Sequence, residues 1–143
     1  MNNEKPKHKK SLARECAFKA VFAWRISQTD IEKHFLDVCQ DPYFKRVDKI
    51  FAGHLVKLFG EKQPLINKQI DPLISLQSSR NLNDVERSIL ELASVELLFV
   101  PETPAKVVIN EYINLCKVYG TDQGFKLVNA VLHQLHQQSQ GQL

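Results

Sequence analysis

The chain has 143 residues, 43% of them hydrophobic and 24% charged, and its formal net charge is +3. This length fits one compact domain, and the composition excludes a wholly disordered or fibrous chain. The longest apolar stretches, such as Leu97 to Val100, are far shorter than the about 20 residues that a membrane helix needs. The basic N-terminus has the charge of a signal peptide's first segment, but Arg14, Glu15 and Lys19 interrupt the apolar region that should follow. We therefore expect a cytoplasmic protein without a membrane partner.

The cysteines and histidines give little indication of a chemical site. Cys16, Cys39 and Cys116 are widely separated among apolar neighbours, which favours reduced, buried thiols over a disulfide framework or a zinc site. His133 and His136 could share a helical face, but two histidines without further ligands are more simply an exposed pair. The chain has no Gly-rich phosphate loop, nucleophile elbow or Cys-x-x-Cys element. We therefore expect no catalytic residue, metal or cofactor, and no enzyme.

The positive charge is concentrated at the N-terminus. Residues 1–14 contain one acid, Glu4, and five cations, so the segment carries +4 and leaves −1 for the rest of the chain; the cations are Lys5, Lys7, Lys9, Lys10 and Arg14. A flexible basic arm over residues 1–10 that runs into a helix is typical of nucleic-acid-binding proteins, because each neutralised phosphate releases counterions. A solvated terminal tail is the alternative.

The first helix is predicted from Ser11 to Ser27, where no Gly or Pro occurs. One face is apolar: Leu12, Ala13, Cys16, Ala17, Ala20 and Trp24. The opposite face carries Arg14, Glu15, Lys19 and Arg25, yet it also carries an apolar stripe of Phe18, Phe22 and Ile26. A covering helix would make Phe18 and Ile26 core residues. Phe22 lies within reach of the cations and could equally stack on an unpaired base.

The later segments also predict helices. Residues 31–39 form a short one, Asp41-Pro42 begins one through about Gly60, and Pro64 opens another to about Ile74. The polar run 77–81 predicts a linker. Three further helices follow: one capped by Asn83 with Glu86 and ending near Phe99, one from Thr103-Pro104 to Gly120, and one from Thr121-Asp122. These patterns predict an all-α bundle of about seven helices within residues 11–143, with subdomains at about 11–76 and 82–137.

Three polar residues fall on predicted apolar faces or inside helices. Glu96 lies in the middle of its helix's apolar stripe, so we expect it to be buried. Because a buried carboxylate is costly without hydrogen bonds, we expect it to be a structural clamp on the N–H groups at the start of the next helix, around Thr103–Lys106. A general acid or base is the alternative, but no partner group is placed near it. For Asn110 and Asn129 we expect interhelical hydrogen bonds.

Five short segments occur in a family-like order and spacing along nearly the whole chain. They are Ala13-Arg14-Glu15-Cys16-Ala17, Ala23-Trp24, Asp84-Val85-Glu86-Arg87-Ser88-Ile89-Leu90, Val108-Ile109-Asn110-Glu111 and Lys126-Leu127-Val128-Asn129. Together with Glu96, they resemble the NusB family. Ala130 departs from the family, which usually has Gly there, and this implies slightly altered helix packing.

The resemblance implies a helical fold of two small subdomains and a role in transcription antitermination. In this family NusB forms a heterodimer with NusE, a small-subunit ribosomal protein. The pair binds a boxA element of single-stranded RNA in ribosomal RNA transcripts and helps RNA polymerase pass termination signals. The face that meets NusE is not indicated by these segments, and the C-terminal subdomain is our expectation.

The resemblance also implies an RNA surface. Its N-terminal segment matches Lys7, His8, Lys9, Lys10 and Arg14, and the charge of the arm adds Lys5 as a candidate. Its aromatic position matches Phe22, and its turn into the last helix makes Tyr119, Asp122, Gln123 and Lys126 secondary candidates. The family's segment is rich in Arg, whereas here it is mostly Lys. Lysine makes point-charge contacts to phosphates without the bidentate geometry of Arg, so we expect attraction to the RNA backbone more than recognition of base edges.

Two other functions remain open at this point. NusB-like domains also occur at the front of some RNA cytosine methyltransferases, but 143 residues leave no room for a catalytic α/β domain, so the chain would have to be a fragment. A helical adaptor that binds only protein, with an idle basic tail, is the second alternative. RNA binding that depends on the basic arm distinguishes an RNA-binding protein from such an adaptor.

Overall fold

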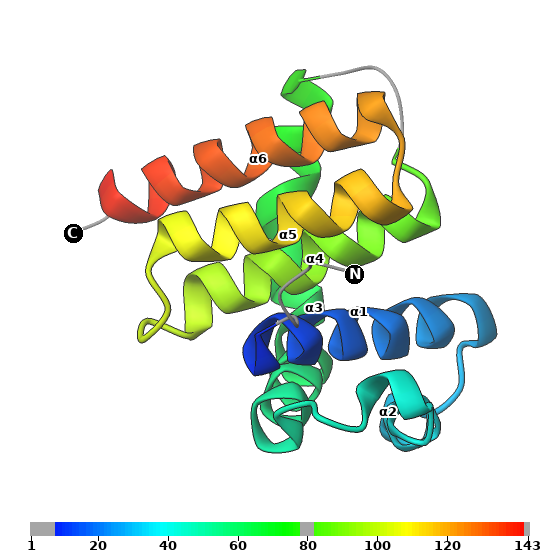
Figure 1. The fold of residues 1–143 in the computed structure, drawn as a ribbon. Coiled ribbons are helices and arrows are strands. Elements are labelled where there is room, and N and C mark those ends of the chain that lie inside the picture. Colours follow the sequence, from blue (N-terminus) through cyan, green and yellow to red (C-terminus); the bar gives the residue numbers. More distant parts are fainter. Residues whose placement is uncertain (1–7, 78–81, 142–143) are drawn as a thin grey trace, which may run out of the picture.

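The protein folds as a bundle of helices around one main hydrophobic core, as seen in a computed structural model that describes residues 8–77 and 82–141. Within these ranges there are six α-helices, one short 3₁₀ helix and no strand, which confirms the all-α prediction. They are α1 (Lys9–Ser27), α2 (Ile31–Cys39), η1 (Pro42–Phe44), α3 (Lys49–Gln77), α4 (Asp84–Phe99), α5 (Ala105–Tyr119) and α6 (Asp122–Gly141). Helices α4, α5 and α6 lie side by side, α3 crosses behind them, and α1 and α2 lie against its lower half (Figure 1). None of the helices in the described ranges is both long and apolar enough to cross a membrane.

The main departure from the predicted elements is α3. The sequence predicted a helix that ends near Gly60 and another that starts at Pro64, but one helix of 29 residues runs through both Pro64 and Pro72. Its apolar stripe is fully buried on both sides of Pro64, with Leu55 and Phe59 before it and Ile66 and Ile70 after it. Packing both halves against the same core therefore outweighs the backbone hydrogen bonds that the prolines remove. The predicted start at Pro42 is a separate turn, η1.

Helix α1 begins earlier and is covered more fully than the sequence predicted. Lys9 and Lys10 belong to its first turn, where the His8 ring accepts a hydrogen bond from the Lys10 backbone N–H. Helices α2, α3, α4 and α5 all contact α1. Phe18 is 2% exposed, as expected for a core residue, but Ile26 is 60% exposed, so its assignment to the core was wrong. Ile26 lies in the last turn of α1.

Glu86 joins the starts of two helices. The predicted capping box is present at α4: the Asn83 side chain accepts from the Glu86 N–H, and the Glu86 side chain accepts from the Asn83 N–H. The same Glu86 carboxylate also accepts hydrogen bonds of 2.7 Å from both the backbone N–H and the hydroxyl of Thr121, just before α6. Gly124 faces this carboxylate so closely that a Cβ there would lie 1.9 Å from its nearer oxygen. A glycine is therefore required at this point of α6 for reasons of space.

We expect Gly124→Ala to lower the free energy of unfolding by about 1–3 kcal/mol, as overpacking typically does, although alanine is the better helix former. Gly60→Ala is the matched control, because a Cβ at Gly60 in α3 would meet nothing within 4 Å. That control should raise stability by up to about 1 kcal/mol through helix propensity. Urea unfolding measures both changes; a stabilising effect at Gly124 would show that Glu86 does not occupy this space.

Candidate nucleic-acid interface

Arg14 is buried and paired, unlike the exposed cation that the sequence predicted. Its side chain contacts Glu96 of α4 through both oxygens, with Nε–Oε1 at 2.9 Å and Nη2–Oε2 at 2.8 Å. Tyr112 of α5 donates its hydroxyl to the same carboxylate at 2.7 Å. Burial alone would lower the pKa of the Arg14 guanidinium, but the hydrogen bonds and charge of Glu96 outweigh burial and raise it. Burial and the Glu96 charge raise the pKa of Tyr112, so this phenol remains a donor.

These contacts correct two predictions. Glu96 is buried and clamps helices together, as expected, but it binds Arg14 and Tyr112 in place of the N–H groups at the start of α5. Arg14 is 3% exposed, and its remaining nitrogen lies 3.5 Å from Glu111. The guanidinium is directed at α4 and α5, so in this structure it is not placed to contact RNA phosphates. The sequence missed this because α4 covers the face of α1 that appeared to be solvent-exposed.

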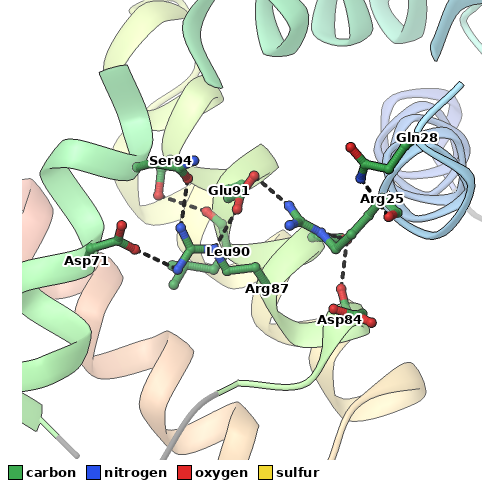
Figure 2. Close-up of polar contacts among 10 residues, drawn as sticks. Arg25, Gln28, Asp71, Asp84, Arg87, Leu90, Glu91 and Ser94 are labelled. Atoms are coloured by element: carbon green, nitrogen blue, oxygen red, sulfur yellow. Dashed lines mark hydrogen bonds and ion pairs between the residues drawn. The ribbon is translucent and has the colours of Figure 1, made fainter. Parts of the chain in front are cut away.

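A second buried network joins the other end of α1 to α3 and α4 (Figure 2). Glu91 of α4 is fully buried between two arginines: Arg25 of α1 lies 2.6 Å from it, and Arg87, one turn earlier on α4, contacts its other oxygen. Arg87 in turn reaches Asp71 and Asn67 of α3, each at 2.7 Å. Because Arg14 and Arg25 are eleven residues apart, they lie on one face of α1, and both are used to dock this face on α4.

A tyrosine cluster lies where α1 meets η1 and the end of α5. The buried carboxylate of Glu15 accepts hydrogen bonds from the Tyr43 hydroxyl at 2.8 Å and the Tyr119 hydroxyl at 2.6 Å. Lys19, one turn further along α1, lies over the rings of Tyr119 and Phe44 at 5.6 and 5.7 Å. Burial and the hydrogen bond to Glu15 raise the pKa of Tyr119. Glu15 thus fixes two aromatic rings beside a lysine. Of these two tyrosines, Tyr43 is 51% exposed.

A basic groove lies where α1 and α3 begin. We define it by the residues that line a hollow of about 780 Å³: Lys9, Lys45, Arg46, Val47, Asp48, Lys49 and Ile50. All four cations are exposed, whereas Asp48, the acid among them, is engaged in capping α3 through a 3.0 Å hydrogen bond from the Phe51 N–H. The Asp48 N–H also points at the Lys9 carbonyl at 3.5 Å, so the first turns of both helices meet here. Their dipoles add to the positive potential of the lysines and Arg46.

The structure brings together some of the predicted RNA-binding residues and not others. Lys9 lines the basic groove, and Lys10 is exposed beside it, with its ammonium 5.2 Å from the Phe51 ring centroid. Tyr119 belongs to the tyrosine cluster. Lys5 and Lys7 lie outside the described residues. Sequence reasoning missed three groove cations and the nearby Tyr43. The cations Lys45, Arg46 and Lys49 are interrupted in the sequence by Val47 and Asp48, and they come close to Lys9 only through the fold.

Phe22 and the start of α6 occupy intermediate positions. Phe22 is half-buried against the core, and its ring centroid lies 6.4 Å from that of Phe18. Asp122, Gln123 and Lys126 are exposed on the first turns of α6, the segment that Glu86 and Thr121 hold in place. These positions are compatible with contact to a ligand, so Phe22 and the α6 residues stay predictions.

Asn110 and Asn129 do not form the interhelical bonds that we expected. Both line a hollow of about 770 Å³ between α5 and α6, together with His133 and His136. Asn110 is exposed and Asn129 is half-buried, and neither side chain makes a hydrogen bond within residues 8–77 and 82–141. The two amides line the hollow, and neither one bonds to the opposite helix. In the same ranges no group of three or more His, Cys, Asp or Glu side chains could hold a metal ion.

Comparison with known proteins gives consistent matches. The sequence model of the NusB family matches residues 11–137. The transcription antitermination protein NusB of Proteus mirabilis is 38% identical over 120 residues, which cover 84% of this chain and 87% of that protein. The structure of T. maritima NusB superposes with a TM-score of 0.80 at 28% identity and covers 96% of this chain and 99% of that one. A crystal structure of the antitermination factors NusB and NusE in complex with dsRNA has the same fold, with a TM-score of 0.78 at 24% identity, covering 91% of this chain and 97% of that one.

We expect Glu96→Gln to lower the free energy of unfolding by about 3–5 kcal/mol, because it leaves the buried Arg14 guanidinium without a carboxylate. Glu111→Gln is the matched control: Glu111 also faces Arg14, but at 3.5 Å and with its side chain 26% exposed. The control should cost less than about 1 kcal/mol. Chemical denaturation of both variants measures the difference, and equal small losses would mean that Arg14 and Glu96 do not anchor α1.

Proposed function

This chain belongs to the NusB family, and we propose that it is a transcription antitermination factor that binds boxA-type single-stranded RNA of ribosomal transcripts together with NusE. The proposal is supported by the family match over residues 11–137. It is also supported by relatives named as antitermination proteins, which this chain matches along nearly their whole length. We infer that it acts in the cytoplasm, as a partner of the RNA polymerase antitermination complex, and that it binds RNA without catalysing a reaction. We also retain residues 11–76 and 82–137 as its two subdomains.

The basic groove is the observation that carries the RNA-binding part of the proposal. Lys9, Lys45, Arg46 and Lys49 line one hollow together with a single carboxylate, Asp48, which also caps α3, so four cations against one carboxylate leave this lining with a formal charge of +3. Such a cluster attracts phosphates without reading bases. Lys10 extends the cluster, and Lys5 and Lys7 precede it in the sequence. RNA phosphates are therefore proposed to follow the start of α1 toward η1.

Aromatic rings near the groove supply a second kind of contact. Tyr43 is half-exposed and lies within η1, the turn that leads to Lys45 and Arg46. Because Glu15 fixes its hydroxyl, the ring loses little freedom when a base stacks on it. We add Tyr43 to the proposed RNA contacts, which also include Phe22, Tyr119, Asp122, Gln123 and Lys126. We leave out Arg14 because its guanidinium is paired with Glu96.

The test is a set of charge-removing variants with a matched control. The triple variant Lys9→Ala, Arg46→Ala, Lys49→Ala removes three groove cations, and we expect it to weaken RNA binding at least tenfold at low salt. The slope of log affinity against log salt should become shallower by about two, because each phosphate of a single strand that the protein neutralises adds about 0.7 to this slope.

The control triple, Lys33→Ala, Lys57→Ala, Lys68→Ala, removes the same charge from exposed positions of α2 and α3 that do not line the groove. It should leave the salt slope nearly unchanged. Equal effects of the two triples would mean that only net charge matters, and no effect of the groove triple would favour an adaptor that binds protein alone.

A further inference from the structure

Two of the three cysteines lie in contact across α1 and α2. The Sγ atoms of Cys16 and Cys39 are 3.9 Å apart, although 22 residues separate them in the chain. Cys16 is fully buried in the middle of α1, whereas Cys39 is half-buried at the last residue of α2. The expectation that all three thiols are buried therefore holds for Cys16 and Cys116 but not for Cys39. Nothing in the proposed RNA surface uses this thiol pair.

The pair belongs to a small hydrophobic cluster that is separate from the main core. Cys16 packs with Ala13, Phe44, Val47 and Ala52, and Cys39 lies against this cluster from α2. Helix α2 has no fully buried residue and packs chiefly on α1, so it lies at the periphery of the bundle. Through Phe44 and Val47 this cluster packs η1 and the end of the groove segment 45–47 against α1.

We propose that Cys16 and Cys39 form a reversible disulfide when the protein meets a hydroperoxide. The sulfur atoms must approach by roughly 2 Å to reach bonding distance. That approach needs only side-chain rotation and a small shift at the end of α2, because Cys39 is the last helical residue and α2 is peripheral. The inference does not depend on the proposed function.

The exposure of the two thiols sets the order of the steps. Cys39, the less buried of the two residues, attacks the hydroperoxide through its sulfur; the S–O bond forms, the O–O bond breaks, and water or an alcohol leaves with the thiol proton, which gives a sulfenic acid. The Cys16 sulfur then attacks the Cys39 sulfur, the S–O bond breaks, and the departing hydroxide takes the Cys16 proton and leaves as water. Burial, with the neighbouring Cys39, raises the pKa of Cys16 to about 12, so Cys16 is not the thiol that attacks the hydroperoxide. Its Sγ lies 3.9 Å from that of Cys39, which places Cys16 for the second step.

The crosslink would join α1 to the segment that carries the groove. It would fasten the end of α2, and with it Tyr43, Lys45 and Arg46, at a fixed distance from α1. A bond that closes a loop of this length restricts the unfolded chain and stabilises the folded one. In a reducing compartment the bond would be reversed by thiol exchange, so its state would follow the supply of oxidant.

The test uses the full chain treated with hydrogen peroxide. Intact mass should fall by about 2 Da through loss of two hydrogens, and the peptide map should contain a Cys16–Cys39 crosslink that dithiothreitol removes. The midpoint of thermal unfolding should rise by roughly 5–10 °C in the oxidised form.

Cys39→Ser should abolish the crosslink and the thermal shift, whereas Cys116→Ser, which removes a buried thiol of the main core, should keep both. A mass gain of about 16 or 32 Da at Cys39 without a crosslink, or a Cys39-linked dimer, would overturn the proposal. The peptide map of the unsubstituted chain decides between these outcomes even if a variant does not fold.

Discussion

The position of α1 depends on two arginines, Arg14 and Arg25, whose side chains are directed at glutamates of α4. Arg14 meets Glu96 and Arg25 meets Glu91, so the two contacts lie toward opposite ends of α1 and in the second half and the middle of α4. Buried charges are costly unless they are paired, and each of these carboxylates has a second partner, Tyr112 for Glu96 and Arg87 for Glu91. A shift of α1 by one turn along α4 would leave both pairs broken, so the charges fix the register that apolar packing alone would permit to vary.

This use of the arginines determines which charges remain for a ligand. The two arginines of α1 are directed inward, and the cations at its exposed start are lysines. Because α1 is held in register, Lys9 comes to lie beside Lys45, Arg46 and Lys49, and Glu15 meets Tyr43 and Tyr119. The groove and the tyrosine cluster are therefore consequences of the same docking. A surface of this kind suits phosphates and stacked bases more than bidentate recognition of base edges.

Much of the fold could be predicted from local patterns. Residues 31–39 form a helix as predicted, the Asn83–Glu86 capping box is present, and the burial of Glu96 follows from its place on an apolar stripe. The prediction failed where tertiary packing overrides local preference, as at Pro64 inside α3. It also failed for Arg14 because a charged helix face looks the same in sequence whether water or a carboxylate of another helix covers it. The partner of Glu96 lies 82 residues away, and no spacing rule within one helix could indicate it.

The most direct test of the antitermination function is a titration of boxA RNA and of a scrambled RNA of equal length. Each titration would be made with and without NusE, at two salt concentrations, because phosphate attraction alone falls steeply with salt. We expect boxA to bind more tightly than the scrambled RNA, and the difference to grow when NusE is present and to persist at the higher salt. Equal, weak binding of both RNAs that NusE does not change would contradict the proposed function.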